Sequence, residues 1–199
     1  MIPEFNHAHV LPPFLGDSAV QSALTSPYGV TATGLVERFA HSRERAILLL
    51  GLLDYRRDLA SFGFCKGFQW LDGSFAEDIE GRESRAPGDI DMVTFAYSPE
   101  GKSKEEIESV LNQNPTLFDV EAAKLKYGCD GYLVRLDGKP EALLRRGAYY
   151  FNLFSHRRGD HVWKGLLHLP LADGQLTDED RARAMLENVL GGQNHAATT

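Results

Sequence analysis

The chain has 199 residues, enough for one well-buried domain and too few for two domains of ordinary size. Charged residues make up 25% of the sequence and the formal net charge is −7, which argues against a protein that coats DNA or RNA through a basic surface. The longest apolar run, residues 46–53, is too short to cross a bilayer, and no cationic segment precedes an apolar one at the N-terminus, so we expect a cytoplasmic protein without a membrane partner.

Residues 1–32 are predicted to form an irregular arm that packs over the domain, because four prolines and Gly16 interrupt every regular pattern there. From Thr33 onward, apolar residues recur at three- and four-residue steps, which predicts a helix capped by Thr33 and a second helix that begins at Ser42 and ends at Gly63. Arginines in this region are interleaved with acidic residues, a pattern typical of a solvated helix surface. These arginines are Arg38, Arg43, Arg45, Arg56 and Arg57.

Strands and further helices alternate along the rest of the chain. The predicted strands are residues 68–72, 89–97, 130–136 and 162–169, and the predicted helices are residues 103–111, 117–125, 142–154 and 177–190. We therefore expect an α/β (α+β) domain over residues 33–190, built on a mixed sheet of about four or five strands with flanking helices on one face. The small and polar residues 191–199 are expected to form a mobile tail.

The most informative segment joins the first two predicted strands. Trp70-Leu71-Asp72-Gly73-Ser74 is followed, after fourteen residues, by Asp89-Ile90-Asp91. Because side chains alternate between the faces of a strand, Asp89 and Asp91 should project to the same side of the sheet. Two adjacent carboxylates repel each other unless a cation lies between them, and Mg²⁺ favours carboxylates together with phosphate oxygens. The Gly-Ser turn supplies backbone N–H groups and a hydroxyl, which suit a phosphate chain.

This arrangement resembles the DNA polymerase β-like nucleotidyltransferase superfamily, in which a strand ending in Gly-Ser is followed by Asp-x-Asp on the next strand. The resemblance covers about residues 68–136 and implies a nucleotidyltransferase fold. It further implies that Gly73 and Ser74 contact the phosphates of an NTP and that Asp89 and Asp91 bind Mg²⁺ or Mn²⁺. The charged segment between Ser74 and Asp89 departs from the family pattern, so we expect the helix there to be short or irregular.

A third carboxylate is expected on a later strand. Asp130 opens the predicted strand at residues 130–136, and in the family such a residue binds the catalytic metal and activates the attacking hydroxyl. Considered alone, Asp130 would be interpreted as the cap of a turn with Gly128 and Gly131. With Asp-x-Asp already upstream, we favour the catalytic interpretation and predict a site of Asp89, Asp91 and Asp130.

Two cations are candidates for binding the nucleotide. Arg82 lies between Ser74 and Asp89, where it either closes over a triphosphate or balances the acidic residues around it; for Arg85 we favour balance. Lys164 follows an aromatic helix end and is interpreted equally well as a phosphate ligand or as part of a solvated turn. The aromatic residues before it, Tyr150, Phe151 and Phe154, are predicted to belong to the core.

The function implied is transfer of an NMP from an NTP such as ATP to a hydroxyl of RNA or protein, with Mg²⁺ or Mn²⁺ as cofactor. Residues 67–74 and 163–165 also look like an uncharacterised bacterial family of toxin–antitoxin or phage-defence modules, which implies a cognate toxin or antitoxin as partner. A sugar-nucleotide glycosyltransferase, the other common Asp-x-Asp enzyme, is disfavoured because only one convincing strand precedes Asp89. A catalytically silent protein of the same fold that binds a partner remains the alternative.

Overall fold

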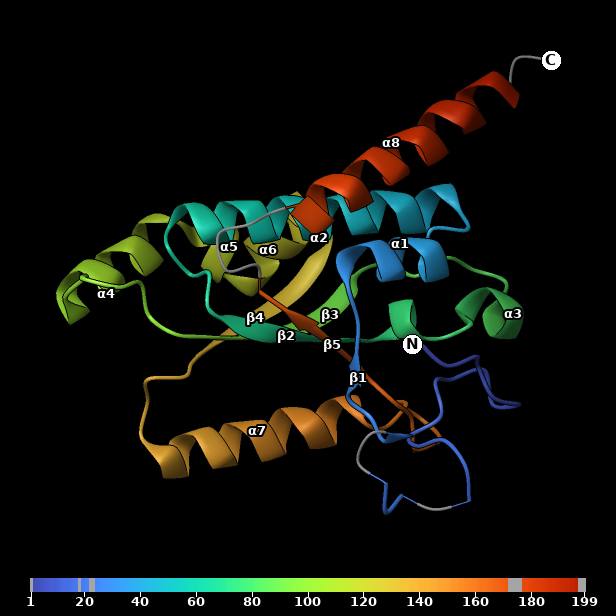
Figure 1. Ribbon diagram of the computed structural model, residues 1–199, viewed down its shortest axis with the longest axis horizontal. Coiled ribbons are helices and arrows are strands. Elements are labelled where there is room, and N and C mark those ends of the chain that lie inside the picture. Colours follow the sequence, from blue (N-terminus) through green and yellow to red (C-terminus); the bar gives the residue numbers. More distant parts are fainter. Residues whose placement is uncertain (1, 18, 22–23, 172–176, 197–199) are drawn as a thin grey trace.

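The computed structural model describes residues 2–17, 19–21, 24–171 and 177–196, and a five-stranded mixed sheet organises them (Figure 1). The strand order is β1-β5-β2-β3-β4. The central pairs, β5 with β2 and β2 with β3, are antiparallel, whereas β1 with β5 and β3 with β4 are parallel. The strands are β1 (Tyr28–Gly29), β2 (Gly67–Asp72), β3 (Ile90–Ala96), β4 (Cys129–Arg135) and β5 (Leu167–Pro170).

One face of the sheet is covered by a layer of helices that contributes most of the core (Figure 1). The predicted caps at Ser42 and at the Ser103–Glu106 capping box are confirmed, and each satisfies N–H groups that a helix start leaves unpaired. The first helix is capped by Thr31 rather than by Thr33. The layer comprises α1 (Ala32–Phe39), α2 (Arg43–Ser61), α4 (Lys104–Gln113), α5 (Pro115–Phe118), α6 (Val120–Tyr127) and α8 (Thr177–Ala196).

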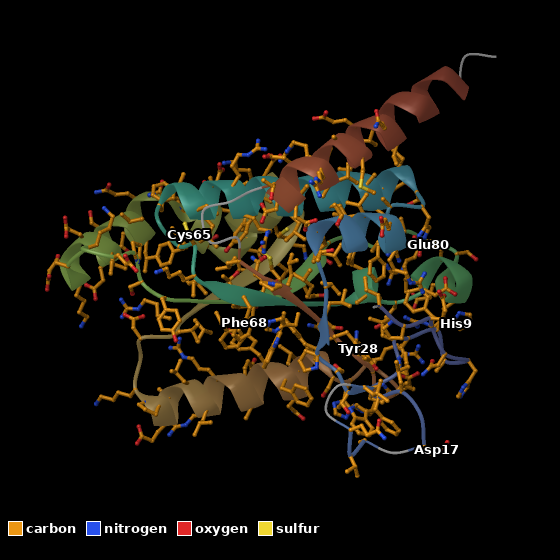
Figure 2. All side chains as sticks on the ribbon, viewed as in Figure 1. His9, Asp17, Tyr28, Cys65, Phe68 and Glu80 are labelled. Carbon is orange, nitrogen blue, oxygen red and sulfur yellow. The ribbon has the colours of Figure 1, made fainter. Side chains whose placement is uncertain are left out.

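The opposite face carries α7 (Pro140–Phe154), so the prediction that helices cover only one face was wrong (Figure 1). A second apolar cluster lies between this helix and the sheet, with Val93 and Val134 on the strands and Phe154 on the helix. Figure 2 shows Phe68 in the same layer. The predicted core role of Phe154 is confirmed, and Tyr150 and Phe151 pack partly buried against this cluster.

The N-terminal arm is part of the domain. It contributes the edge strand β1, it forms two short bridges, and Val10 and Leu11 are fully buried. Its packing over the domain was predicted, but its strand was not, because a two-residue strand gives no periodic signal.

Two other boundaries differ from the prediction. β5 is shorter than the predicted 162–169 because Lys164 N–H donates to the carbonyl of Ser155 and Gly165 N–H to that of Leu11, which are not sheet partners. Helix α8 continues to Ala196, so most of the predicted tail is helical, while residues 197–199 lie outside the described residues. None of the helices in the described ranges is long and apolar enough to cross a membrane.

Two arginines that were predicted to be solvated are buried. The Arg45 side chain is 0% exposed and donates to the Glu80 carboxylate (2.6 and 2.9 Å) and to the carbonyls of Phe75 (2.7 Å) and Glu77 (2.8 Å). Arg56 is buried against Glu179. Helical spacing shows which side of a helix a residue occupies, but it does not show that acceptors from other elements lie there.

Candidate active site

Three aspartates lie side by side across neighbouring strands. Asp72 on β2 is the register partner of Asp91 on β3, and Asp91 is the register partner of Asp130 on β4. Residues in register on adjacent strands have Cβ atoms about 4.5–5.5 Å apart, so the three carboxylates form a row. They share the α7 face of the sheet, since they alternate with residues that pack into the opposite core, such as Met92 and Cys129. Asp89 precedes β3 by one residue and lies two residues from Asp91.

The seven residues that the sequence analysis singled out line one cleft of about 520 Å³. They are Gly73, Ser74, Arg82, Asp89, Asp91, Asp130 and Lys164. The structure thus brings together residues from β2, the β2–β3 connection, β3, β4 and the segment before β5. Between Ser74 and Asp89 lie only a 3₁₀ turn (Ser74–Ala76) and the five-residue α3 (Ile79–Glu83), in agreement with the expected short helix.

Position 73 requires glycine for two reasons, its backbone conformation and the closeness of the Asp91 carboxylate. Its φ of +76° lies in the left-handed region that favours glycine, and a Cβ at this position would lie 1.9 Å from Asp91 Oδ2. The Asp91 carboxylate therefore rests directly against the backbone of the Gly-Ser turn. Any larger residue at position 73 would displace the central aspartate of the row.

Burial disfavours the charged forms of these carboxylates. It raises the pKa of Asp72 to about 7 although the Lys164 ammonium opposes the shift. The pKa of Asp91 is raised to about 6 by burial and by the charges of Asp89 and Asp130. Burial also raises the pKa of Asp130, in spite of the nearby Lys124. The row is a concentration of negative charge that lacks enough positive charge of its own.

Two carboxylate oxygens in this row have no partner. Asp72 Oδ1 and Asp130 Oδ1 are both buried and accept no hydrogen bond from any described residue. A buried charged oxygen without a partner is costly, and a bound cation would satisfy it. The donor chemistry of the cleft, carboxylate oxygens beside backbone N–H groups, therefore fits a hard divalent cation such as Mg²⁺.

The acidic side chains of the cleft do not converge on a common point. Among the described residues, no group of three or more His, Cys, Asp or Glu side chains is arranged closely enough to hold a metal ion. Instead, Lys124 Nζ lies 2.5 Å from Asp89 Oδ2 and 3.9 Å from Asp130 Oδ2. An ammonium group thus neutralises part of the row.

Lys164 lies at the floor of the cleft, and its interpretation as part of a solvated turn was wrong. The side chain is 3% exposed, and its ammonium contacts Asp72 Oδ2 at 3.0 Å, Glu77 Oε1 at 2.7 Å and the Gly73 carbonyl at 3.4 Å. Burial alone would lower the pKa of Lys164, but the carboxylates of Asp72 and Glu77 raise it. All three ammonium protons therefore have acceptors, and Lys164 holds the Gly-Ser turn against β2.

The arginines of the β2–β3 connection are paired with acidic residues. Arg82 lies 3.0 Å from Glu77 Oε2 and 2.5 Å from Glu83 Oε1. Arg85 lies 2.7 Å from Glu83 Oε2, which confirms that it balances local charge. The role of Arg82 in nucleotide binding remains a prediction, although its position on the cleft wall is compatible with it.

Sequence reasoning missed three residues of the cleft, Asp72, Glu77 and Lys124, whereas Arg158 had been considered with Lys164 as a phosphate ligand or as part of a solvated turn. Asp72 stands next to the Gly-Ser motif, and its period-two spacing from Trp70 and Phe68 was the available signal. Arg158 is exposed, has no ion-pair partner within the described ranges, and partly offsets the raised pKa values of Asp91 and Asp130. It is an exposed positive charge that lines the cleft.

Comparisons with known proteins place the chain in a family. Neither the curated proteins nor the solved structures gave a match. The model of a family described as "Family of unknown function (DUF6932)" matches residues 3–170, and the chain therefore belongs to that family.

Proposed function

We propose that the domain has a nucleotidyltransferase fold and transfers an NMP from an NTP to a hydroxyl group of RNA or protein. The observation that carries the proposal is the row of Asp72, Asp91 and Asp130 with two unpaired buried oxygens, placed against the Gly73–Ser74 turn in one cleft. Carboxylates next to a phosphate-binding turn are the parts that phosphoryl transfer needs, because its catalysis consists of positioning and charge stabilisation. The link to toxin–antitoxin or phage-defence modules rests on the resemblance alone.

In this proposal, Asp89 and Asp91 would hold the ion that accompanies the NTP, and Asp130 together with Asp91 or Asp89 would hold a second one. A bound Mg²⁺ or Mn²⁺ would neutralise phosphate charge and lower the pKa of the acceptor hydroxyl. Backbone N–H groups at Gly73 and Ser74 and the Ser74 hydroxyl bind phosphate oxygens. Arg158, which has no ion-pair partner among the described residues, provides positive charge at the mouth of the cleft.

The reaction balances as a single displacement at the α-phosphorus. The bond from the acceptor oxygen to the α-phosphorus forms while the bond to the bridging oxygen of the β-phosphate breaks, and pyrophosphate leaves with that electron pair. The hydroxyl proton passes to an Asp130 carboxylate oxygen.

Label transfer tests the proposal. The full chain is incubated with each α-³²P-labelled NTP, Mg²⁺ or Mn²⁺, and either total cell RNA or total cell protein. We expect label in one acceptor fraction with the wild type and with the control Glu105→Gln, an exposed change on α4. Asp91→Asn and Asp130→Asn should abolish it. If no label is transferred with any NTP and either metal, the proposed enzymatic activity is wrong and the partner-binding alternative is left.

A further inference from the structure

The sheet has an open edge next to the proposed active site. β4 pairs with β3, and the structure describes no strand on its other side. Two hydrogen bonds show which residues of β4 face β3. Ile90 N–H donates to the Gly128 carbonyl at 2.9 Å, and Leu136 N–H donates to the Ala96 carbonyl at 2.8 Å. In a parallel ladder, alternate residues bond to the same neighbour. The N–H and C=O groups of Gly131, Leu133 and Arg135 therefore face away from the sheet.

A groove of about 760 Å³ runs along this edge. Gly131, Leu133 and Arg135, whose main-chain groups point away from β3, are all among its lining residues. Leu111 and Phe118 form its wall on the side of α4 and α5, and Leu143 lines it on α7. β4 also contains no proline, and an uncovered edge strand of this kind is a template for pairing with another extended chain.

The groove adjoins the active-site cleft along β4. Asp130 lines the cleft, and the next residue on the strand, Gly131, lines the groove. A chain that pairs with β4 is thereby guided to the carboxylate that we assign to the acceptor hydroxyl.

The charges of the groove favour a polypeptide with an acidic residue. Arg135 and Arg146 both line it, and neither has an ion-pair partner within 4 Å in the described part of the chain. Asp119, by contrast, accepts from Ala122 N–H at 3.0 Å as the cap of α6. Arg135 lies five residues beyond Asp130, about 16 Å along an extended strand.

A nucleic acid fits this groove less well. Its backbone has no N–H groups to donate to the carbonyls of Gly131 and Leu133, so it cannot continue the hydrogen-bond ladder of the sheet. Backbone pairing with alternate side chains in pockets is, in contrast, how an exposed sheet edge recognises an extended peptide.

We propose that this groove is the acceptor site and that it binds an extended polypeptide segment, which pairs with the β4 edge and presents a Ser, Thr or Tyr hydroxyl to Asp130. The proposal rests on the proposed function and names its acceptor as protein. The acceptor oxygen becomes esterified to the α-phosphate and pyrophosphate leaves, as above. The segment carries an acidic side chain about five residues from the modified hydroxyl, opposite Arg135.

Fluorescent ten-residue peptides test the docking. Each contains one Ser and one Glu at a varied distance, and binding to the full chain is followed by anisotropy. We expect the tightest binding with Glu about five residues from Ser, and a loss of about 10-fold when alternate peptide nitrogens are methylated. Methylation of the intervening nitrogens is the matched control and should change binding little. Arg135→Glu should reverse the preference from Glu to Lys, with unchanged circular dichroism showing that the variant is folded.

The outcomes separate the two proposals. Equal sensitivity to both methylation patterns, or displacement of the peptide by a single-stranded RNA decamer, would overturn the groove as a polypeptide site. If the wild type and Asp91→Asn both bind the peptide but the wild type transfers no label, the groove is a polypeptide site and the proposed enzymatic activity is wrong. If label is transferred to RNA and no peptide binds, the groove is not a polypeptide site but the proposed enzymatic activity is supported.

Discussion

Two buried charge clusters lie on opposite faces of the sheet, and they differ in whether their polar atoms are satisfied. On the α2 face, Arg56 donates to Glu179 Oε1 at 2.8 and 2.6 Å, to Gln69 Oε1 at 2.6 Å and to the Pro170 carbonyl at 2.7 Å. On the α7 face, Asp72 Oδ1 and Asp130 Oδ1 have no partner among the described residues, and the pKa of Asp91 is raised to about 6.

The difference teaches how to distinguish a structural cluster from a binding site. A closed network holds elements together, because each group has its partner within the chain. Here Arg56 ties α2 to β2 and α8. A network with unpaired oxygens and mutually repelling charges is less stable than it could be, and such excess charge is typical of sites that receive a ligand.

The largest expected effect comes from opening the closed cluster. Arg56→Ala leaves Glu179 and Gln69 buried without their partner, and we expect it to lower the free energy of unfolding by about 3–5 kcal/mol. Arg57→Ala, the exposed neighbour on the same helix, is the control and should stay within about 0.5 kcal/mol of the wild type. Urea denaturation measures both. A loss below about 1 kcal/mol for Arg56→Ala would show that the cluster does not hold the helices.

The open cluster should respond with the opposite sign. Asp91→Asn removes a partly buried carboxylate that its neighbours repel, so we expect the apo protein to gain up to about 3 kcal/mol at pH 7. The same change should abolish the rise in melting temperature that Mg²⁺ with an NTP gives the wild type. Destabilisation by Asp91→Asn, measured in urea without metal, would contradict the view that the row is strained.

The sequence predicted the open cluster better than the closed one. Gly73-Ser74 and Asp89-x-Asp91 are local patterns whose spacing reflects strand geometry, and Asp130 opens a strand with clear β-favouring residues. The row also needed Asp72, which depends on the antiparallel register of β2 and β3, and register between strands with a long connection cannot be read from spacing.

The burial of Arg56 and Lys164 could not be predicted for a similar reason. Their acceptors lie far away in the sequence, on Glu179 for Arg56 and on Asp72 and Glu77 for Lys164. An arginine or lysine among acidic neighbours is usually solvated, and only the tertiary structure shows which acceptors replace water. The position of α7 could not be predicted either, because its apolar pattern predicts a helix but not the face of the sheet that the helix covers.

The pH dependence of stability gives a smaller and more specific signal. The pKa of Asp91 is raised above its ordinary value to about 6, so the folded state binds its proton more tightly than the unfolded state. Stability from this group is therefore present at low pH and is lost as pH rises from about 4 to 6, by about 1.4 kcal/mol per pH unit. We expect the difference in unfolding free energy between wild type and Asp91→Asn to follow this slope and to be flat above pH 7. A difference that does not change between pH 4 and 7 would contradict the raised pKa.

The smallest effect concerns Lys124, whose ammonium contacts Asp89 and lies near Asp130. Its ammonium lies 2.5 Å from Asp89 Oδ2, but the side chain is 47% exposed, so water weakens the pair. Because Lys124 and a divalent cation compete for the same carboxylates, Lys124→Met should tighten Mn²⁺ binding by about 2- to 5-fold. Lys126→Met, on the same helix and paired with Asp58, is the control and should leave Mn²⁺ affinity unchanged. Calorimetry at constant ionic strength measures both variants. Weaker Mn²⁺ binding by Lys124→Met would mean that the ammonium helps to assemble the carboxylates. A divalent cation site would then no longer explain the unpaired oxygens of the row.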